Sequence, residues 1–141
     1  MANSLFVDTS GWASLFINTQ PHHRQAEHYF RQALQHHQGL ITTNYILTEL
    51  VALLHSPLRI PRFRIFDVVD GIKAATYVQV IYIDKAIDSA AWGLCKSRAD
   101  KNWSLVDCSS FIVMQQLGLQ EALTTDHHFE QAGFIRLLKF N

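Results

Sequence analysis

The sequence predicts an α/β fold: a three-layer α/β/α sandwich with a mostly parallel central sheet, formed by residues 1–141 as a single domain. Short runs rich in β-branched and aromatic residues alternate with longer segments whose apolar residues recur at helical spacing. This alternation is typical of βαβ units, in which helices cover both faces of a parallel sheet. The first predicted strand and a later one end at Asp8 and Asp126, the edge where such sheets form their sites.

In the first half of the chain, apolar patterns and capping residues indicate where elements begin and end. Thr9 and Ser10 are suited to cap a helix after the first strand, and Gly39 is suited to end the next helix. Thr43 or Asn44 can cap the helix after the second strand. The predicted elements are a strand at 4–8, helices at 11–18 and 23–38, a strand at 40–43 and a helix from 44.

In the second half, Pro57 and Pro61 bracket a break before the next helix. Asp84 is interpreted as the N-cap of a later helix, and Gly118 closes the one after it. The β-branched and aromatic residues of "YVQVIYI" favour a strand. The predicted elements are helices at 62–75, 84–99, 104–118 and 127–133, and strands at 77–83, 121–126 and 134–140.

Composition excludes several classes of protein. Lys and Arg together number 12, as do Asp and Glu, so overall charge indicates no particular partner. Cys95 and Cys108 are too few for a disulfide framework and predict buried free thiols. No apolar run approaches the roughly 18 residues of a membrane span, and the N-terminus lacks the basic start of a signal peptide. We therefore expect a cytoplasmic protein with no membrane partner.

Three acids are each the only formally charged residue in a long stretch, counting His as neutral: Asp8, Glu49 and Asp107. Asp126 is less isolated. Taken singly, three of these four acids have structural interpretations as turn or capping residues; Asp107, for example, follows Ser104 at capping-box spacing. Glu49 lies in the middle of a predicted helix, where capping is not available. Together, the isolated acids suggest carboxylates that converge in the fold.

Converging carboxylates repel and raise one another's pKa values unless a cation lies between them. Oxygen ligands suit a hard ion, Mg²⁺ or Mn²⁺, which can polarise a phosphate. Zinc is disfavoured, because adjacent histidines should point different ways on a helix. The histidine pairs are His22-His23, His36-His37 and His127-His128.

Four segments resemble the motifs of the PIN-domain family, in particular its VapC-type toxins: "FVDTSGW", "LTELV", "SLVDCSSF" and "LTTDHHFEQAGF". The resemblance implies a PIN-like fold in which Asp8, Glu49, Asp107 and Asp126 are the catalytic acids that hold Mg²⁺ or Mn²⁺. It implies an endoribonuclease in which metal-activated water attacks the phosphodiester in line. Such proteins are usually homodimers, inhibited by a small, separately encoded antitoxin protein.

The resemblance also implies supporting residues. Ser10, Ser104 and Thr125 match polar positions that orient the acids or waters in the family.

A basic, aromatic stretch, "SPLRIPRFRIF", is the predicted RNA contact. Arg59, Arg62 and Arg64 suit phosphate recognition through their planar guanidinium groups, and Phe63 and Phe66 suit base stacking. The alternative is an ordinary solvated helix face whose aromatic side chains turn into the core or a dimer contact.

Other functional classes fit less well. A phosphoacceptor receiver domain needs an adjacent acidic pair after the first strand, and "FVDTS" supplies one acid. A phosphatase of the Asp-x-Asp type needs an acid at position 10, which is Ser. A catalytically weak or inactive PIN domain that binds RNA or protein stays open as the alternative function. The RNA target, whether transfer, ribosomal or messenger RNA, also stays open.

Overall fold

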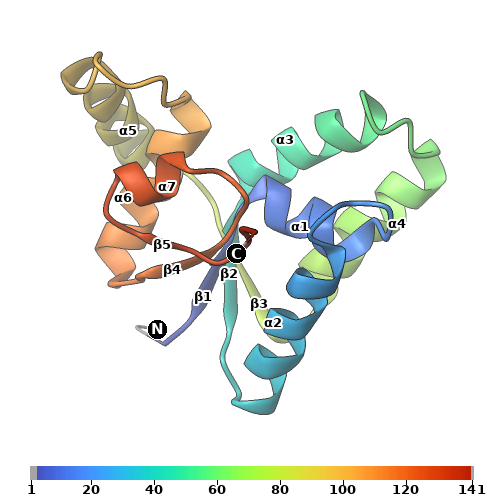
Figure 1. Cartoon of the computed structure of the whole chain (residues 1–141). Coiled ribbons are helices and arrows are strands. Elements are labelled where there is room, and N and C mark those ends of the chain that lie inside the picture. The colour runs from blue at the N-terminus through green and yellow to red at the C-terminus, as the bar shows by residue number, and fades with distance from the viewer. Residues whose placement is uncertain (1–2, 141) are drawn as a thin grey trace.

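The structure, a computed structural model, describes residues 3–140 and contains one five-stranded sheet. The strands lie in the order β3-β2-β1-β4-β5, and every neighbouring pair is parallel (Figure 1). The predicted parallel sheet is thereby confirmed. The strands are β1 Leu5–Val7, β2 Leu40–Thr43, β3 Val78–Ile81, β4 Glu121–Leu123 and β5 Ile135–Arg136.

Helices cover both faces of this sheet, as predicted for a three-layer sandwich (Figure 1). One layer holds α1 Thr9–Phe16, α2 His23–Gln35, α3 Asn44–His55 and α4 Arg62–Ala74; the other holds α5 Lys85–Ser97, α6 Leu105–Leu117 and α7 His128–Gln131. From β1 the chain adds β2 and β3 on one side of the sheet, and it then adds β4 and β5 on the other side of β1. The strand order therefore reverses between β1 and β4. In parallel sheets, sites form beyond the carboxyl ends of the strands at such a point, so a site is expected there.

Several predicted caps are present in the structure. The side chains of Thr43 and Asp84 accept hydrogen bonds from the third residue beyond each, at 3.1 and 2.8 Å. Ser104 and Asp107 form a reciprocal capping box at the start of α6. Gly118 ends α6 with a left-handed φ of 67°, which favours glycine. At these helix ends, the capping hydrogen bonds and the left-handed glycine lie where the sequence predicted them.

Two predicted helix ends are wrong. Asp8 is the N-cap of α1, and Thr9 and Ser10 lie in its first turn, where their hydroxyls bond other residues. The helix α2 ends at Gln35 rather than near Gly39, and His37 takes the left-handed conformation with φ 52°.

The core lies between the sheet and the two helix layers, and β1 and β2 are buried along their whole length. The indole N–H of Trp12 donates to the Thr42 hydroxyl at 3.0 Å, which links α1 to β2 inside this core. Cys108 is a buried free thiol, as predicted, whereas the free thiol Cys95 is only partly buried, so the prediction of burial is wrong for Cys95. No helix among residues 3–140 is long and apolar enough to cross a membrane.

Candidate metal-binding and active site

An open hollow of about 440 Å³ lies beyond the carboxyl ends of β1 and β4, where the topology predicts a site. Three of the four predicted acids line it, from three separate segments of the chain. Its lining consists of Asp8, Thr9, Ser10, Glu49, Leu53, Thr125, Asp126 and His127.

Asp8 is the most buried acid of the site, with 5% of its surface exposed. The Thr124 hydroxyl donates to its Oδ2 at 2.9 Å, and the Ser10 hydroxyl lies 3.4 Å from the same oxygen. Burial raises the pKa of Asp8 to about 7, and the charges of Glu49 and Asp107 raise it as well, while hydrogen bonds from the Thr124 hydroxyl and the Thr9 backbone N–H lower it. No positively charged side chain of residues 3–140 is among the groups that shift the pKa of Asp8.

Glu49 lies in the middle of α3, as predicted, and is half-buried. The Thr9 hydroxyl donates to its Oε1. Burial raises the pKa of Glu49, and the charges of Asp107 and Asp126 raise it further. The apolar residues next to it in sequence are not all in the core, since Leu50 is fully buried whereas Val51 is 40% exposed. Glu49 thus borders the hollow rather than the core.

Asp107 lies in the first turn of α6 and has a structural role as well. Its Oδ2 accepts the backbone N–H of Ser104 at 3.1 Å and lies 3.0 Å from Nδ1 of His128. Burial raises the pKa of Asp107, and the charge of Asp126 adds to this shift. The capping interpretation therefore holds for Asp107, which does not line the hollow, although its charge acts on Asp8 and Glu49.

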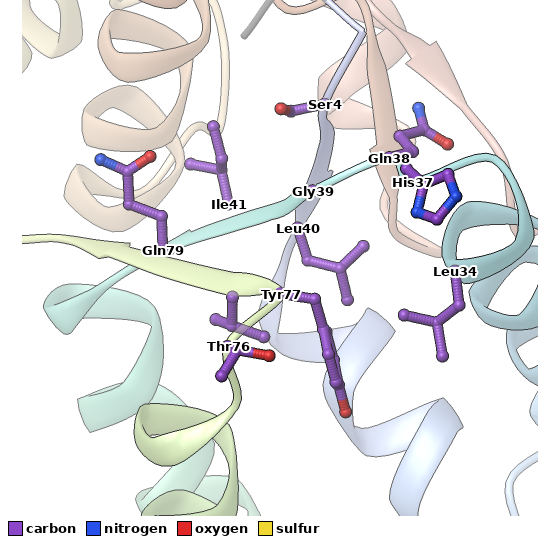
Figure 2. Close-up of a pocket in the computed structure, with 11 residues that line it drawn as sticks. Ser4, Leu34, His37, Gln38, Gly39, Leu40, Ile41, Thr76, Tyr77 and Gln79 are labelled. Carbon is purple, nitrogen blue, oxygen red and sulfur yellow. The ribbon is translucent and has the colours of Figure 1, made fainter.

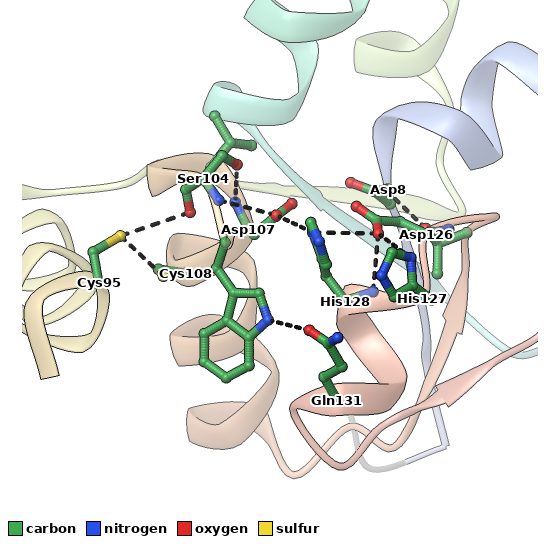
Figure 3. A network of polar contacts seen from close by, with 12 residues as sticks. Asp8, Cys95, Ser104, Asp107, Cys108, Asp126, His127, His128 and Gln131 are labelled. Atoms are coloured by element: carbon green, nitrogen blue, oxygen red, sulfur yellow. Dashed lines mark hydrogen bonds and ion pairs between the residues drawn. The ribbon is translucent and has the colours of Figure 1, made fainter. Parts of the chain in front are cut away.

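Asp126 follows β4 and faces two histidines (Figure 3). Its Oδ1 accepts the backbone N–H of His128 at 2.9 Å and lies 3.4 Å from Nδ1 of that residue. Nδ1 of His127 is 3.8 Å from the same oxygen, and the two imidazole rings are 4.6 Å apart. The expectation that these adjacent histidines point different ways is wrong, because His127 precedes the short helix α7 and is not part of it.

Taken together, the four acids come from the end of β1, from α3, from α6 and from the loop after β4. Asp8, Glu49 and Asp107 have pKa values raised by burial first and by the charge of other members of this set second. A divalent cation among them would remove that repulsion, and carboxylate oxygens are the ligands that Mg²⁺ and Mn²⁺ prefer. The chemistry of these donors therefore suits such an ion, while the group of described side chains whose ligand atoms all lie within 4.8 Å of one another is Asp126, His127 and His128.

Four residues of this site were missed by sequence reasoning: Thr9, Thr124, His127 and His128. Thr124 rather than Thr125 carries the hydroxyl that binds Asp8, while Thr125 donates its backbone N–H to Ser10 at 2.9 Å. Both threonines belong to the motif "LTTD", so the sequence indicates that a threonine lies near the acids. It does not indicate which of the two side chains turns inward.

The predicted RNA-contact residues are all exposed but do not line the hollow. Phe63 is 70% exposed and Phe66 is 52% exposed, so the alternative that these rings turn into the core is wrong. The guanidinium of Arg62 lies 5.2 Å from the Phe66 ring centre. Arg59 and Arg64 complete an exposed basic and aromatic surface at the turn between α3 and α4.

A second hollow of about 470 Å³ lies at the opposite end of the sheet, beside the starts of β2 and β3 (Figure 2). Leu34, Leu40 and Tyr77 contribute to its lining, with Gln38 and Gln79 at its rim. Among the described residues that line it there is no carboxylate. It therefore lacks the chemistry of the acid-lined hollow, although it is slightly larger.

The raised pKa of Asp8 predicts that the ion-free protein loses stability as pH rises. The folded protein keeps this proton up to about pH 7, whereas the unfolded chain releases it near 3.8. The folded state binds more protons between these values, so stability falls as pH rises through this window. In EDTA we expect a Tm several degrees lower at about pH 8 than at about pH 5.5, and Mn²⁺ should restore it.

The control for this pH dependence is Asp8→Asn, which cannot ionise at position 8. Its Tm in EDTA should depend on pH less than that of the wild type. Equal pH dependence in the two proteins would show that Asp8 is not the group responsible.

Comparison with known proteins extends these observations. The PIN domain family model matches residues 5–135. The "23S rRNA-specific endonuclease VapC20" of Mycobacterium tuberculosis is 29% identical over 133 residues, which are 94% of this chain and 97% of the relative. The crystal structure of Mycobacterium tuberculosis VapC20, described as a "Sarcin-Ricin loop cleaving toxin", matches with a TM-score of 0.84 at 28% identity. The match covers 96% of this chain and 100% of that chain.

A more distant solved structure shares the fold. The crystal structure of FitAcB from Neisseria gonorrhoeae matches with a TM-score of 0.60 at 16% identity, and covers 96% of each chain.

Proposed function

Because the chain belongs to the PIN domain family, we propose that it is a Mg²⁺- or Mn²⁺-dependent endoribonuclease, the toxin of a VapBC-type pair. The observation that supports the proposal is the group of carboxylates of Asp8, Glu49 and Asp126 around one hollow, where a bound cation would offset their burial and mutual repulsion. As for VapC-type toxins, we propose a homodimer that works in the cytoplasm and is inhibited by a small antitoxin protein.

Asp8, Glu49, Asp107 and Asp126 are the residues that would hold the ion. When bound, the ion would polarise the scissile phosphate and lower the pKa of a water molecule. The protein's own contribution is orientation: hydrogen bonds from the Thr124 hydroxyl to Asp8 and from the Ser104 N–H to Asp107 fix the direction of these two carboxylates.

The proposed substrate is structured ribosomal RNA. The support is the relative VapC20, whose names describe cleavage of 23S rRNA and of the sarcin-ricin loop and whose whole length is matched here. A cleavage assay that compares ribosomal with transfer RNA tests this proposal.

The deciding experiment compares the wild type with Asp8→Asn on 23S rRNA and transfer RNA in Mn²⁺. We expect the variant to cleave roughly a hundredfold to a thousandfold more slowly, since the ion supplies several kcal/mol of transition-state stabilisation. EDTA should abolish wild-type cleavage. Asp70→Asn is the matched control, because Asp70 is an exposed acid on α4, away from the hollow.

Equal, EDTA-insensitive cleavage by the wild type and Asp8→Asn would falsify the assignment of the acids. RNA binding without cleavage in any divalent ion would instead support the alternative function, a PIN domain that only binds RNA.

The exposed arginines near the start of α4 provide a separate test of RNA contact. In an Asp8→Asn background, which removes cleavage, replacing Arg59, Arg62 and Arg64 with Ala should weaken RNA binding. The slope of log K against log salt should fall by about 2, since each phosphate contact with a single strand contributes roughly 0.7. An unchanged slope, measured by fluorescence anisotropy, would exclude this surface from the RNA contact.

A further inference from the structure

A further hollow of about 310 Å³, the flanking hollow, adjoins the acid-lined hollow and shares Ser10, Leu53 and Thr125 with it. Ser10 connects the two, since its hydroxyl lies 3.4 Å from Oδ2 of Asp8. Sites for small ligand groups occupy hollows of roughly 300–1,000 Å³. A group bound in the flanking hollow would therefore lie directly beside a phosphate held at the acids.

The lining of the flanking hollow carries no formal charge. Among the described residues that line it there is neither an acid nor Lys or Arg, counting His as neutral. Pro21, Leu53 and Phe140 supply apolar surface, and Gln20 and His22 supply polar groups. Such a lining suits a neutral group with a few hydrogen-bonding atoms rather than a phosphate or a metal ion. In an RNA nucleotide, that neutral group is the base.

Phe140 and His22 form an aromatic surface at the flanking hollow. Their ring centres are 4.2 Å apart, and their planes are inclined by 31°. Phe140 is 75% exposed, so its ring is accessible to a ligand. Nucleobases stack on aromatic side chains regardless of sequence, because every base has a π-face. The aromatic surface therefore has the chemistry that base stacking requires.

Gln25 fixes the tautomer of His22. The Gln25 Nε2 donates to the Lys139 carbonyl at 3.0 Å, so its Oε1 is the atom that lies 2.8 Å from Nδ1 of His22. An amide oxygen only accepts, so Nδ1 carries the proton, and Nε2 of the neutral ring keeps its lone pair. Within residues 3–140, no group bonds this Nε2. His22 can therefore accept a hydrogen bond from an N–H group of a base, while Gln25 holds the segment that carries Phe140 against α2.

We propose that the flanking hollow is a base-binding subsite, in which one nucleobase next to the scissile phosphate stacks on Phe140 and donates a hydrogen bond to His22. The inference deepens the proposed function and rests on it, because it takes the substrate to be RNA with its phosphate at the acids. The acids carry the reaction, whereas the subsite adds affinity and a base preference at one position beside the cut.

Removing the bases from the RNA separates base contacts from phosphate contacts. The probes are two fluorescein-labelled pentanucleotides with the same phosphates, one of adenosine and one entirely abasic. Fluorescence anisotropy measures both with the full chain in the Asp8→Asn background, which removes cleavage. Phe140→Leu keeps an apolar side chain without a ring. It should weaken binding of the adenosine pentanucleotide about fivefold or more and that of the abasic one less than about twofold. Phe140→Trp, which keeps a ring, should bind both as position 140 of the wild type does.

The sequences at the cut ends provide a second measurement, made on the otherwise wild-type protein in Mn²⁺ with RNA of random sequence. We expect a base preference at one position next to the cut. His22→Ala should reduce that preference at this position alone, whereas a general structural defect would slow all cuts alike. His36→Ala is the matched control, because His36 is exposed at the other end of α2 and bonds Gln32 in the same helix.

Equal weakening of the two pentanucleotides by Phe140→Leu would overturn the proposal, because it would show a contact that does not depend on the base. Unchanged binding in that variant, or an unchanged preference at the cut in His22→Ala, would also overturn it. RNA cleavage by the wild type would in these cases leave the nuclease assignment intact. Failure to cleave RNA in any divalent ion would overturn the proposed function, while the anisotropy measurement, which needs no cleavage, would still decide the subsite.

Discussion

Replacing Glu49 with Gln should reduce RNA cleavage by about a hundredfold or more, a loss of several kcal/mol of metal-dependent transition-state stabilisation. The same variant should be as stable as the wild type, or more stable, when no ion is bound. Gln keeps an oxygen that can accept the Thr9 hydroxyl, and it removes a charge whose pKa is raised by burial and by Asp107 and Asp126.

Cleavage rates in Mn²⁺ and Tm values in EDTA measure these two effects separately. Glu121→Gln is the matched control, because Glu121 is exposed at the start of β4, at the other end of the strand from the site. A large loss of Tm for Glu49→Gln in EDTA would contradict the prediction, since it would make Glu49 a structural residue.

Replacing Gly11 with Ala should destabilise the protein at the point where α1 contacts the sheet. A Cβ at position 11 would lie 2.1 Å from the carbonyl oxygen of Leu123 and 3.1 Å from a methyl group of Val7. Backbone atoms cannot move aside as flexible side chains do. We therefore expect the free energy of unfolding to fall by at least the roughly 1–3 kcal/mol typical of overpacking. Ser10 and its contacts with Asp8 and Thr124 would move with the helix, so cleavage should fall as well.

Gly93→Ala provides the matched control for this prediction. Gly93 lies inside α5, is exposed, and a Cβ there would meet nothing within 4 Å. Ala is the better helix former by about 0.8–1.0 kcal/mol, so this variant should be slightly more stable. Urea denaturation midpoints measure both changes, and equal midpoints for Gly11→Ala and wild type would show that α1 can shift without cost.

The sequence alone determined the architecture, and it singled out the acids that the structure brings to one region of the fold. Alternating strands and helices predict a parallel sheet, and the carboxyl ends of parallel strands lie at one edge, so Asp8 and Asp126 were expected to approach each other. Caps such as Asp84 and Ser104 are local, and the structure has them where the sequence indicates. These features depend on periodicity and on short-range hydrogen bonding, which a single sequence records.

The tertiary structure decided which atoms face one another at the site. The choice of Thr124 over Thr125, the hydrogen bond from Thr9 to Glu49 and the turn of His128 toward two acids depend on how α1, α3, α6 and the loop after β4 pack together. Residues adjacent in sequence take opposite directions from a strand, and a change of one position in a loop exchanges them. Such directions follow from contacts between distant segments, so no local pattern contains them.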